Sequence, residues 1–217
     1  MTRSRTAMTV DAIIARAPII PVLTVETVEA AVPLARALVE GGLPVLEVTL
    51  RTKAALDVIA AMAAEVPDAI VGAGTVLNPA DLEASRRAGA VFGVSPGLTP
   101  ELARAAEGFP FLPGAVTPSE IMAARDLGYG VLKFFPAEIY GGQSALSALA
   151  GPFAGMRFCP TGGVRESNLR AYLSLPNVAV VGGTWIAGKA EVAAGDWAAV
   201  TARARRAVAI ARGEEEA

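Results

Sequence analysis

Two charged residues interrupt segments that are otherwise apolar. Lys133 lies in the segment GVLKFFP (130–136), and Glu47 lies in the segment VLEVTLRT (45–52). Burying an ammonium group is costly unless it is paired or loses its proton, and a lysine shielded from water is a common protein nucleophile. Side chains two residues apart on a strand share a face, so Glu47, Thr49 and Arg51 would lie together. A lysine, a glutamate and an arginine in one small space predict a nucleophile, an acid/base and an anion clamp.

Each of these charges also has a purely structural interpretation. Lys133 could lie on an exposed edge strand, or be buried only to neutralise a carboxylate. Glu47 could form a structural ion pair with Arg51. We favour the functional interpretation for strands that close into a barrel. A closed barrel has no edge strand, and its interior would hold Lys133 as a third charge beside Glu47 and Arg51.

The composition of the chain excludes several kinds of catalytic and metal site. The 217-residue chain has no histidine and one cysteine, Cys159, which excludes Ser-His-Asp and Cys-His catalysis, His-ligated metal sites and an internal disulfide. Its 19 basic and 21 acidic residues give a formal charge of −2, which does not indicate nucleic acid as a partner. Apolar runs are short and interrupted, so neither a membrane span nor a signal peptide is predicted. We expect a cytoplasmic protein in which Cys159 is a small core residue.

Short apolar runs alternate with Ala/Leu-rich helical runs along the whole chain. Eight near-continuous apolar runs are typical of buried parallel strands: 19–24, 45–50, 70–75, 92–95, 111–116, 131–135, 157–160 and 178–182. Helices are predicted at 25–40, 53–65, 79–88, 100–107, 118–127, 166–173 and 191–212. The pairs NP (78–79), TP (99–100) and TP (117–118) are typical helix starts.

This alternation predicts an α/β fold, a single (β/α)8 TIM barrel with an extra N-terminal helix. We expect one domain over 1–217, with the helix in 1–18, the barrel in 19–212 and a flexible tail in 213–217. A doubly wound open sheet also alternates strand and helix. However, no G-x-G-x-x-G follows the first strand, and no composition break divides the chain.

Glycine pairs follow the last two predicted strands, at PTGGV (160–164) and VGGTW (181–185). Consecutive N–H groups beside a hydroxyl form a cradle for phosphate, and barrels often bind phosphate in the loops after strands seven and eight. A single Gly-Gly would indicate only a turn, whereas two at this pair of strands favour phosphate. The small residues of GAGTV (72–76) and VSPG (94–97) leave room for a substrate, and Thr75 could donate a hydrogen bond to an anion.

Together these segments resemble the 2-keto-3-deoxy-6-phosphogluconate (KDPG) aldolase family, the class I pyruvate aldolases of the Entner–Doudoroff pathway. The similar segments are EVTLRT (47–52), GAGTV (72–76), KFFPA (133–137) and CPTGG (159–163), and the resemblance runs from about residue 19 to 186. It implies a lyase that cleaves KDPG to pyruvate and glyceraldehyde 3-phosphate through a Schiff base. It also implies a homotrimer that needs no metal or organic cofactor.

The resemblance implies a role for each residue of these segments. Lys133 would form the Schiff base with the substrate ketone, and Glu47 would shuttle protons. Arg51 and Thr75 would bind the substrate carboxylate. The other implied substrate contacts are Pro96, Phe135 and Thr161, with Gly162, Gly163, Gly183 and Thr184 around the 6-phosphate. Many family members have serine where this chain has Thr184, whose hydroxyl and backbone N–H would still serve the phosphate.

Three alternatives stay open at this point. A sugar-phosphate isomerase or epimerase on the same barrel would explain the glycine loops and Glu47, but it leaves Lys133 without a covalent task. Within the aldolase interpretation, the substrate could belong to the gluconate or the galactonate series, with 4-hydroxy-2-oxoglutarate as a second substrate. A catalytically inert barrel used as an assembly scaffold is the third alternative, which the intact Lys–Glu–Arg set disfavours.

Overall fold

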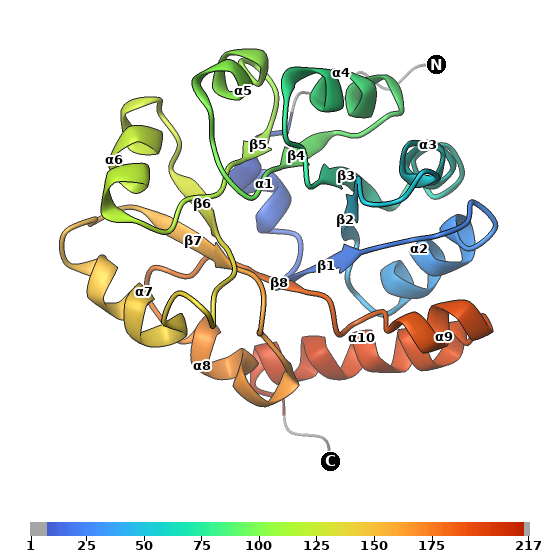
Figure 1. Ribbon diagram of the computed structural model, residues 1–217. Coiled ribbons are helices and arrows are strands. Elements are labelled where there is room, and N and C mark those ends of the chain that lie inside the picture. Colours follow the sequence, from blue (N-terminus) through green and yellow to red (C-terminus); the bar gives the residue numbers. More distant parts are fainter. Residues whose placement is uncertain (1–7, 215–217) are drawn as a thin grey trace.

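The computed structural model describes residues 8–214, in which strands and helices alternate (Figure 1). The strands are β1 (Ile19–Leu23), β2 (Val45–Thr49), β3 (Ile70–Gly74), β4 (Phe92–Val94), β5 (Phe111–Leu112), β6 (Val131–Phe134), β7 (Arg157–Pro160) and β8 (Val181–Gly183). The helices are α1 (Val10–Ile14), α2 (Ala31–Glu40), α3 (Ala55–Glu65), α4 (Pro79–Arg87), α5 (Pro100–Ala105), α6 (Pro118–Asp126), α7 (Gly142–Ala150), α8 (Leu169–Leu173), α9 (Lys189–Ala194) and α10 (Trp197–Arg212). A short 3-10 helix, η1 (Glu166–Asn168), precedes α8.

The strands form a curled parallel sheet with helices around it (Figure 1), which confirms the predicted parallel α/β architecture. Six strands are hydrogen-bonded in the order β5-β4-β3-β2-β1-β8, and β6 pairs with β7. Single parallel bridges join Gly114 to Lys133, Phe158 to Val178 and Thr161 to Gly182. These bridges place the β6–β7 pair beside β5 on one side and beside β8 on the other. The strand order follows the chain, without the reversal that defines a doubly wound sheet.

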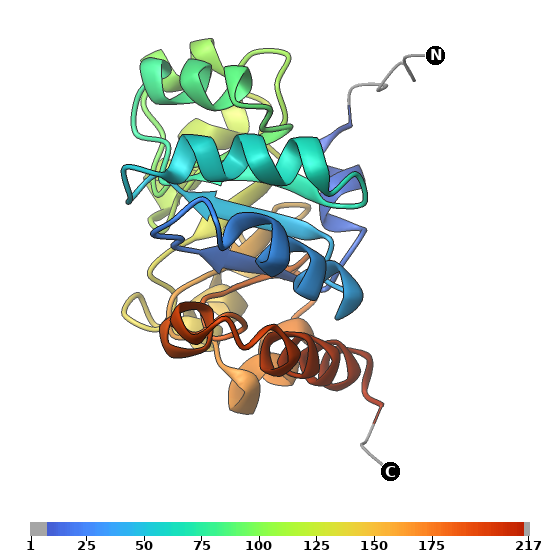
Figure 2. The same cartoon turned by 90° about the vertical axis from the view of Figure 1, so that its right-hand side faces the viewer.

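Buried apolar side chains form two clusters, one on each side of the sheet. The larger cluster packs the outer faces of the strands against the helices, with Leu34 of α2 and Leu46 of β2 among its members. The smaller cluster takes side chains from the strands that enclose the interior and includes Ile13 and Ile14 of α1. Helix α1 therefore covers the amino ends of the strands, and the side view in Figure 2 places it opposite the loops that follow them.

Three helices begin at capping residues that the sequence predicts. The side chains of Asn78, Thr99 and Thr117 each accept a hydrogen bond from the backbone N–H three residues later, and each is followed by proline. Such caps satisfy N–H groups that have no partner within the helix. They fix the ends of three loops that leave the carboxyl ends of β3, β4 and β5.

The structure corrects several predicted boundaries. The predicted helix 191–212 is two helices, because Gly195 adopts a left-handed φ of 67° and ends α9 before α10 begins. The predicted helix 25–40 starts only at Ala31, since Pro33 has no N–H to donate and fits only the first turn. The predicted strand 178–182 is shorter and shifted, because β8 starts at Val181 and Val178 makes one bridge to Phe158.

The two ends of the chain are described only in part. Within the predicted N-terminal helix of 1–18, residues 10–14 form α1, and residues 1–7 lie outside the described residues. Residues 215–217 of the predicted tail also lie outside them. Between residues 8 and 214, no helix is long and apolar enough to span a membrane.

Candidate active site

Lys133 of β6 and Glu47 of β2 meet inside the curl of the sheet. Val131 and Val45, two residues earlier on the same strands, belong to the interior cluster, so the two charged side chains point inward as well. Lys133 Nζ donates to Glu47 Oε1 at 2.8 Å and to Oε2 at 3.2 Å. The side chains are only 7% and 3% exposed. The pair thus places an amine and a proton acceptor in contact at a site largely shielded from water.

Gly74, the last residue of β3, makes the position of the Glu47 carboxylate possible. A Cβ atom at Gly74 would lie 2.2 Å from Glu47 Oε1 and 2.6 Å from its Cγ. Any side chain here would therefore displace the carboxylate. The register of β2 against β3, with Thr49 beside Gly74, brings these two residues together.

Arg51 and Thr75 form a second pair, at the ends of β2 and β3. Arg51 is exposed and lies just beyond β2, and its Nε donates to Thr75 Oγ1 at 3.2 Å. Thr75 has a φ of 59°, the left-handed region that β-branched residues rarely adopt. Such a conformation costs about 1–3 kcal/mol, and residues held in it cluster at functional sites. A guanidinium and a hydroxyl held together here could bind a carboxylate.

The three predicted substrate contacts lie at the carboxyl ends of β4, β6 and β7. Pro96 is exposed after β4, and its carbonyl passes so close to Gly114 that a Cβ there would lie 2.1 Å from the oxygen. The half-buried Phe135 ring has its centroid 5.6 Å from Lys133 Nζ. Thr161 is 2% exposed and follows β7. Phe135 is therefore the predicted contact that lies beside Lys133.

The glycine loops lie side by side at the ends of β7 and β8. Thr161 bridges to Gly182, and a Cβ at Gly182 would lie 2.2 Å from Thr161 Oγ1. Gly162 and Gly163 have φ values of 91° and 85°, which glycine adopts without strain. Within residues 8–214, their N–H groups donate to no protein acceptor. Two adjacent N–H groups without a protein partner are suited to an anion.

The predicted residues of the last loop follow β8. Gly183 is buried against the Trp185 ring, and a Cβ there would lie 2.2 Å from that ring. Thr184 is exposed, so its hydroxyl is accessible beside the β7 loop. The structure thus brings the two segments predicted to bind phosphate together through the bridge between Thr161 and Gly182.

The contacts decide between some of the structural alternatives. Glu47 pairs with Lys133, while Arg51 donates to Thr75, so the proposed Glu–Arg ion pair is wrong. Lys133 is 6% exposed, so it is no exposed edge-strand lysine. Burial raises the pKa of the Cys159 thiol to about 12, which agrees with its prediction as a core residue. The part of the chain that is described holds no group of three metal-ligating side chains.

A cluster beside the β7 loop was not predicted from the sequence. Glu138 follows β6 by four residues, and its carboxylate accepts hydrogen bonds from the hydroxyl of Tyr172 and from Asn168 Nδ2, the latter at 3.4 Å. Asn168 Nδ2 also donates to the Gly163 carbonyl at 3.1 Å. The only sequence signal is Glu138 in the segment PAE (136–138), directly after the predicted sixth strand.

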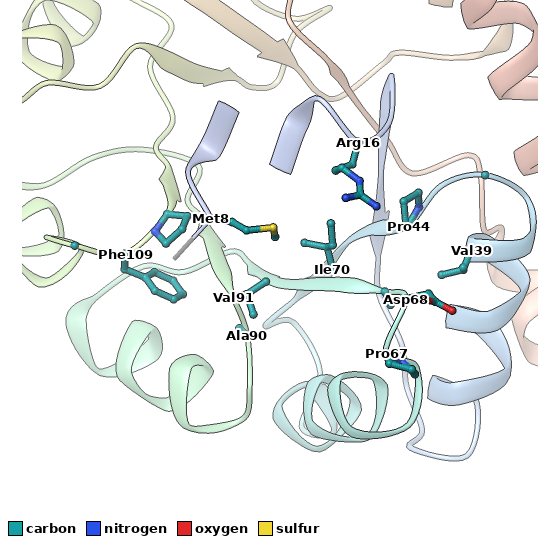
Figure 3. A pocket seen from close by; sticks show the side chains of 14 residues that line it. Met8, Arg16, Val39, Pro44, Pro67, Asp68, Ile70, Ala90, Val91 and Phe109 are labelled. Atoms are coloured by element: carbon teal, nitrogen blue, oxygen red, sulfur yellow. The ribbon is translucent and has the colours of Figure 1, made fainter. Parts of the chain in front are cut away.

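A separate cavity lies at the opposite, amino ends of the strands (Figure 3). It is lined by Pro44, Asp68, Val91 and Pro110, which precede successive strands, and by Arg16 after α1. None of the predicted site residues lines it. The candidate active site is therefore the group of residues at the carboxyl ends, where parallel barrels place their chemistry.

Comparison with known proteins identifies the family. The family model "KDPG and KHG aldolase" matches residues 10–203. A 2-dehydro-3-deoxy-phosphogluconate aldolase of Pseudoalteromonas atlantica is 52% identical over 203 residues, covering 93% of this chain and 94% of the relative. The KHG/KDPG aldolase of Escherichia coli is 52% identical over 200 residues, covering 91% and 94%.

A solved structure of a similar protein contains a covalent reaction intermediate. KDPG aldolase from Legionella pneumophila, with pyruvate held as a covalent carbinolamine intermediate, superimposes with a TM-score of 0.91 at 41% identity, covering 93% of this chain and 98% of that one. The interior lysine–glutamate pair described above is suited to such an intermediate. The chain therefore belongs to the KDPG and KHG aldolase family, as its sequence resemblance indicated, and is a Schiff-base aldolase, a carbon–carbon lyase.

Proposed function

We propose that this chain cleaves 2-keto-3-deoxy-6-phosphogluconate to pyruvate and glyceraldehyde 3-phosphate, with Lys133 as the nucleophile. The amine attacks the C2 ketone to give a carbinolamine, which loses water to become a protonated Schiff base. When the C3–C4 bond breaks, its electron pair moves into this iminium and leaves an enamine of pyruvate. Protonation at C3 and addition of water then release pyruvate and regenerate the amine. The Schiff base itself is the electron sink, so the reaction needs no external cofactor.

Glu47 is the proton shuttle of this sequence. Its contact with Lys133 Nζ at 2.8 Å allows it to take the proton that must leave the ammonium before attack. The same carboxylate then helps water depart, accepts the C4 hydroxyl proton directly or through a water, and returns a proton to C3.

The remaining residues bind the two ends of the substrate. Arg51 and Thr75 bind the carboxylate, supported by their contact at 3.2 Å. The 6-phosphate is bound by the loops that follow β7 and β8. The N–H groups of Gly162 and Gly163, which have no acceptor among residues 8–214, support this assignment. The full set assigned to the phosphate is Gly162, Gly163, Gly183 and Thr184. The set assigned to the rest of the substrate is Pro96, Phe135 and Thr161.

The buried contact between Lys133 and Glu47 carries this proposal. It is tested by following pyruvate release from KDPG with a coupled lactate dehydrogenase assay, for the wild type and for Lys133→Ala. Turnover by the wild type that disappears in the variant is expected. Normal turnover by Lys133→Ala would refute the Schiff-base assignment to Lys133, whereas a folded wild type without turnover would favour the isomerase or scaffold alternative.

Substrate range and architecture are further parts of the proposal. The E. coli relative is a KHG/KDPG aldolase, so we assign 4-hydroxy-2-oxoglutarate to this chain as a second substrate. The gluconate series is preferred over the galactonate series, which the same assay with the C4 epimer tests. The single bridges around β6 and β7 support closure of all eight strands into one (β/α)8 barrel within a single domain.

A homotrimer completes the proposal. Exposed apolar side chains at Leu77, Ile139 and Tyr140, which are 57%, 82% and 50% exposed, would favour packing against other copies. Sedimentation equilibrium tests this, since a monomer at micromolar concentration would contradict it. The cytoplasmic location stays a prediction from the sequence.

A further inference from the structure

Glu138 connects the segment that carries the nucleophile to the loop assigned to the phosphate. It lies after β6, five residues beyond Lys133, while its partners Asn168 and Tyr172 belong to the segment after β7. Its side chain packs over Gly163, where a Cβ atom would lie 2.2 Å from Glu138 Cγ. Glu138 is exposed, whereas Tyr172 is fully buried and directs its hydroxyl at the carboxylate.

Three consecutive carbonyls of the β7 loop accept hydrogen bonds from Glu138 and its neighbours. The carbonyls of Thr161 and Gly162 accept from the backbone N–H groups of Ala137 and Glu138, at 2.8 and 3.1 Å. The Gly163 carbonyl accepts from Asn168 Nδ2 at 3.1 Å. In a trans peptide the carbonyl of one residue and the N–H of the next residue point in opposite directions. Fixing these carbonyls therefore turns the N–H groups of Gly162, Gly163 and Val164 toward the opposite side. The first two are held by the main chain of Ala137 and Glu138, whereas the Glu138 side chain acts at Gly163, by packing over it and by orienting Asn168.

The Asn168 amide is itself held in place. Its Oδ1 accepts from the backbone N–H of Arg165 at 2.7 Å, and its Nδ2 donates to Glu138 as well as to Gly163. The Glu138 carboxylate in turn is held by the Tyr172 hydroxyl. Burial and this hydrogen bond raise the pKa of the Tyr172 phenol, so the hydroxyl remains a donor at neutral pH.

We propose that Glu138, held by Tyr172, is a positioning residue that orients the Gly162-Gly163 loop and so determines preference for a phosphorylated substrate. This inference rests on the proposed phosphate site. Glu138 makes no contact with Lys133 or Glu47 among the described residues. Its loss should weaken phosphate binding while leaving formation of the Schiff base intact.

The test compares KDPG with unphosphorylated 2-keto-3-deoxygluconate for Glu138→Ala, Glu138→Gln and Tyr172→Phe. Hydrogen bonds to a charged group suggest that Glu138→Ala raises KM for KDPG about tenfold or more. Glu138→Gln keeps an acceptor for Tyr172 and should recover part of the loss. The kcat/KM for the unphosphorylated substrate, and borohydride trapping of pyruvate on the enzyme, should stay unchanged. Glu166→Gln is the matched control, because this neighbouring carboxylate pairs with Arg206 instead.

Several outcomes would overturn the proposal. Equal losses on both substrates would give Glu138 a merely structural role, and no change in any variant would remove it from the site. Should Tyr172→Phe fail to fold, the exposed Glu138 variants decide the question alone. Thr184→Ala distinguishes a failure of the Glu138 proposal from a failure of the proposed phosphate site. If it raises KM for KDPG and the Glu138 variants do not, only this inference fails, whereas if neither does, the proposed phosphate site fails with it.

Discussion

Replacing Lys133 by methionine should lower the stability of the protein strongly, because Lys133 is the ion-pair partner of the buried Glu47 inside the curl of the sheet. Methionine keeps an unbranched side chain of similar length but removes the ammonium group. The Glu47 carboxylate, whose side chain is 3% exposed, would then lose the partner that contacts it at 2.8 Å. Because the Lys133 side chain is 7% exposed, water screens this pair far less than a surface pair.

The size of the effect follows from this burial. Removing one partner of a buried ion pair costs about 3–5 kcal/mol, because the other charge is left uncompensated. For a chain of this length each kcal/mol lowers Tm by about 2–4 °C, so Lys133→Met should lower it by roughly 6–20 °C. Replacing both partners by methionine removes both buried charges, and such apolar replacements are often neutral or stabilising.

The assay is urea unfolding followed by circular dichroism, for the wild type, Lys133→Met, Glu47→Met and the double variant. The double variant should be more stable than either single variant, although it has no activity. A Lys133→Met protein as stable as the wild type would refute the reasoning, as would single effects that simply add in the double variant.

Four further predictions follow from the site. Glu47→Gln should lower kcat for KDPG cleavage by about 10²–10⁴-fold in a steady-state assay, and an unchanged kcat would remove Glu47 from proton transfer. Gly74→Ala places a Cβ 2.2 Å from Glu47 Oε1, so kcat should fall about a hundredfold with an unchanged circular dichroism spectrum; wild-type activity would contradict the close packing. Thr184→Ala should raise KM for KDPG about five- to tenfold but not for 2-keto-3-deoxygluconate, and an equal effect on both would place the phosphate elsewhere. Because burial raises the pKa of the Cys159 thiol from 9.0 to about 12, the unfolded chain loses this proton first, and stability should fall as pH rises across that range. In urea unfolding series at increasing pH, Cys159→Ala should lose less stability than the wild type, and parallel losses would contradict this.

Much of the fold could be predicted because each strand carries its own signal. Near-continuous apolar runs separated by helical runs indicate buried parallel strands, and proline after Asn78, Thr99 and Thr117 marks helix starts that the structure has. The break between α9 and α10 was missed, because Gly195 lies in an otherwise helical, Ala-rich run and only its left-handed φ ends the helix.

Only part of the candidate site could be predicted from the sequence. Lys133 and Glu47 could be singled out because a charge inside an apolar strand is anomalous, and the period of two then indicates which face it occupies. Glu138, Asn168 and Tyr172 could not, because they lie in a turn, a 3-10 helix and a five-residue helix, where no periodicity predicts which side chains meet. Their hydrogen bonds join residues 30 and 34 positions apart.

The most direct test of the account is covalent trapping of pyruvate. The protein is incubated with pyruvate and sodium borohydride, and the product is examined by intact mass and by peptide mapping. The chain has three lysines, Lys53, Lys133 and Lys189, so the position of an adduct is easily assigned. A single reduced pyruvate adduct on Lys133 is predicted, absent from Lys133→Met. A folded protein without an adduct, or with one on Lys53 or Lys189, would contradict the Schiff-base assignment.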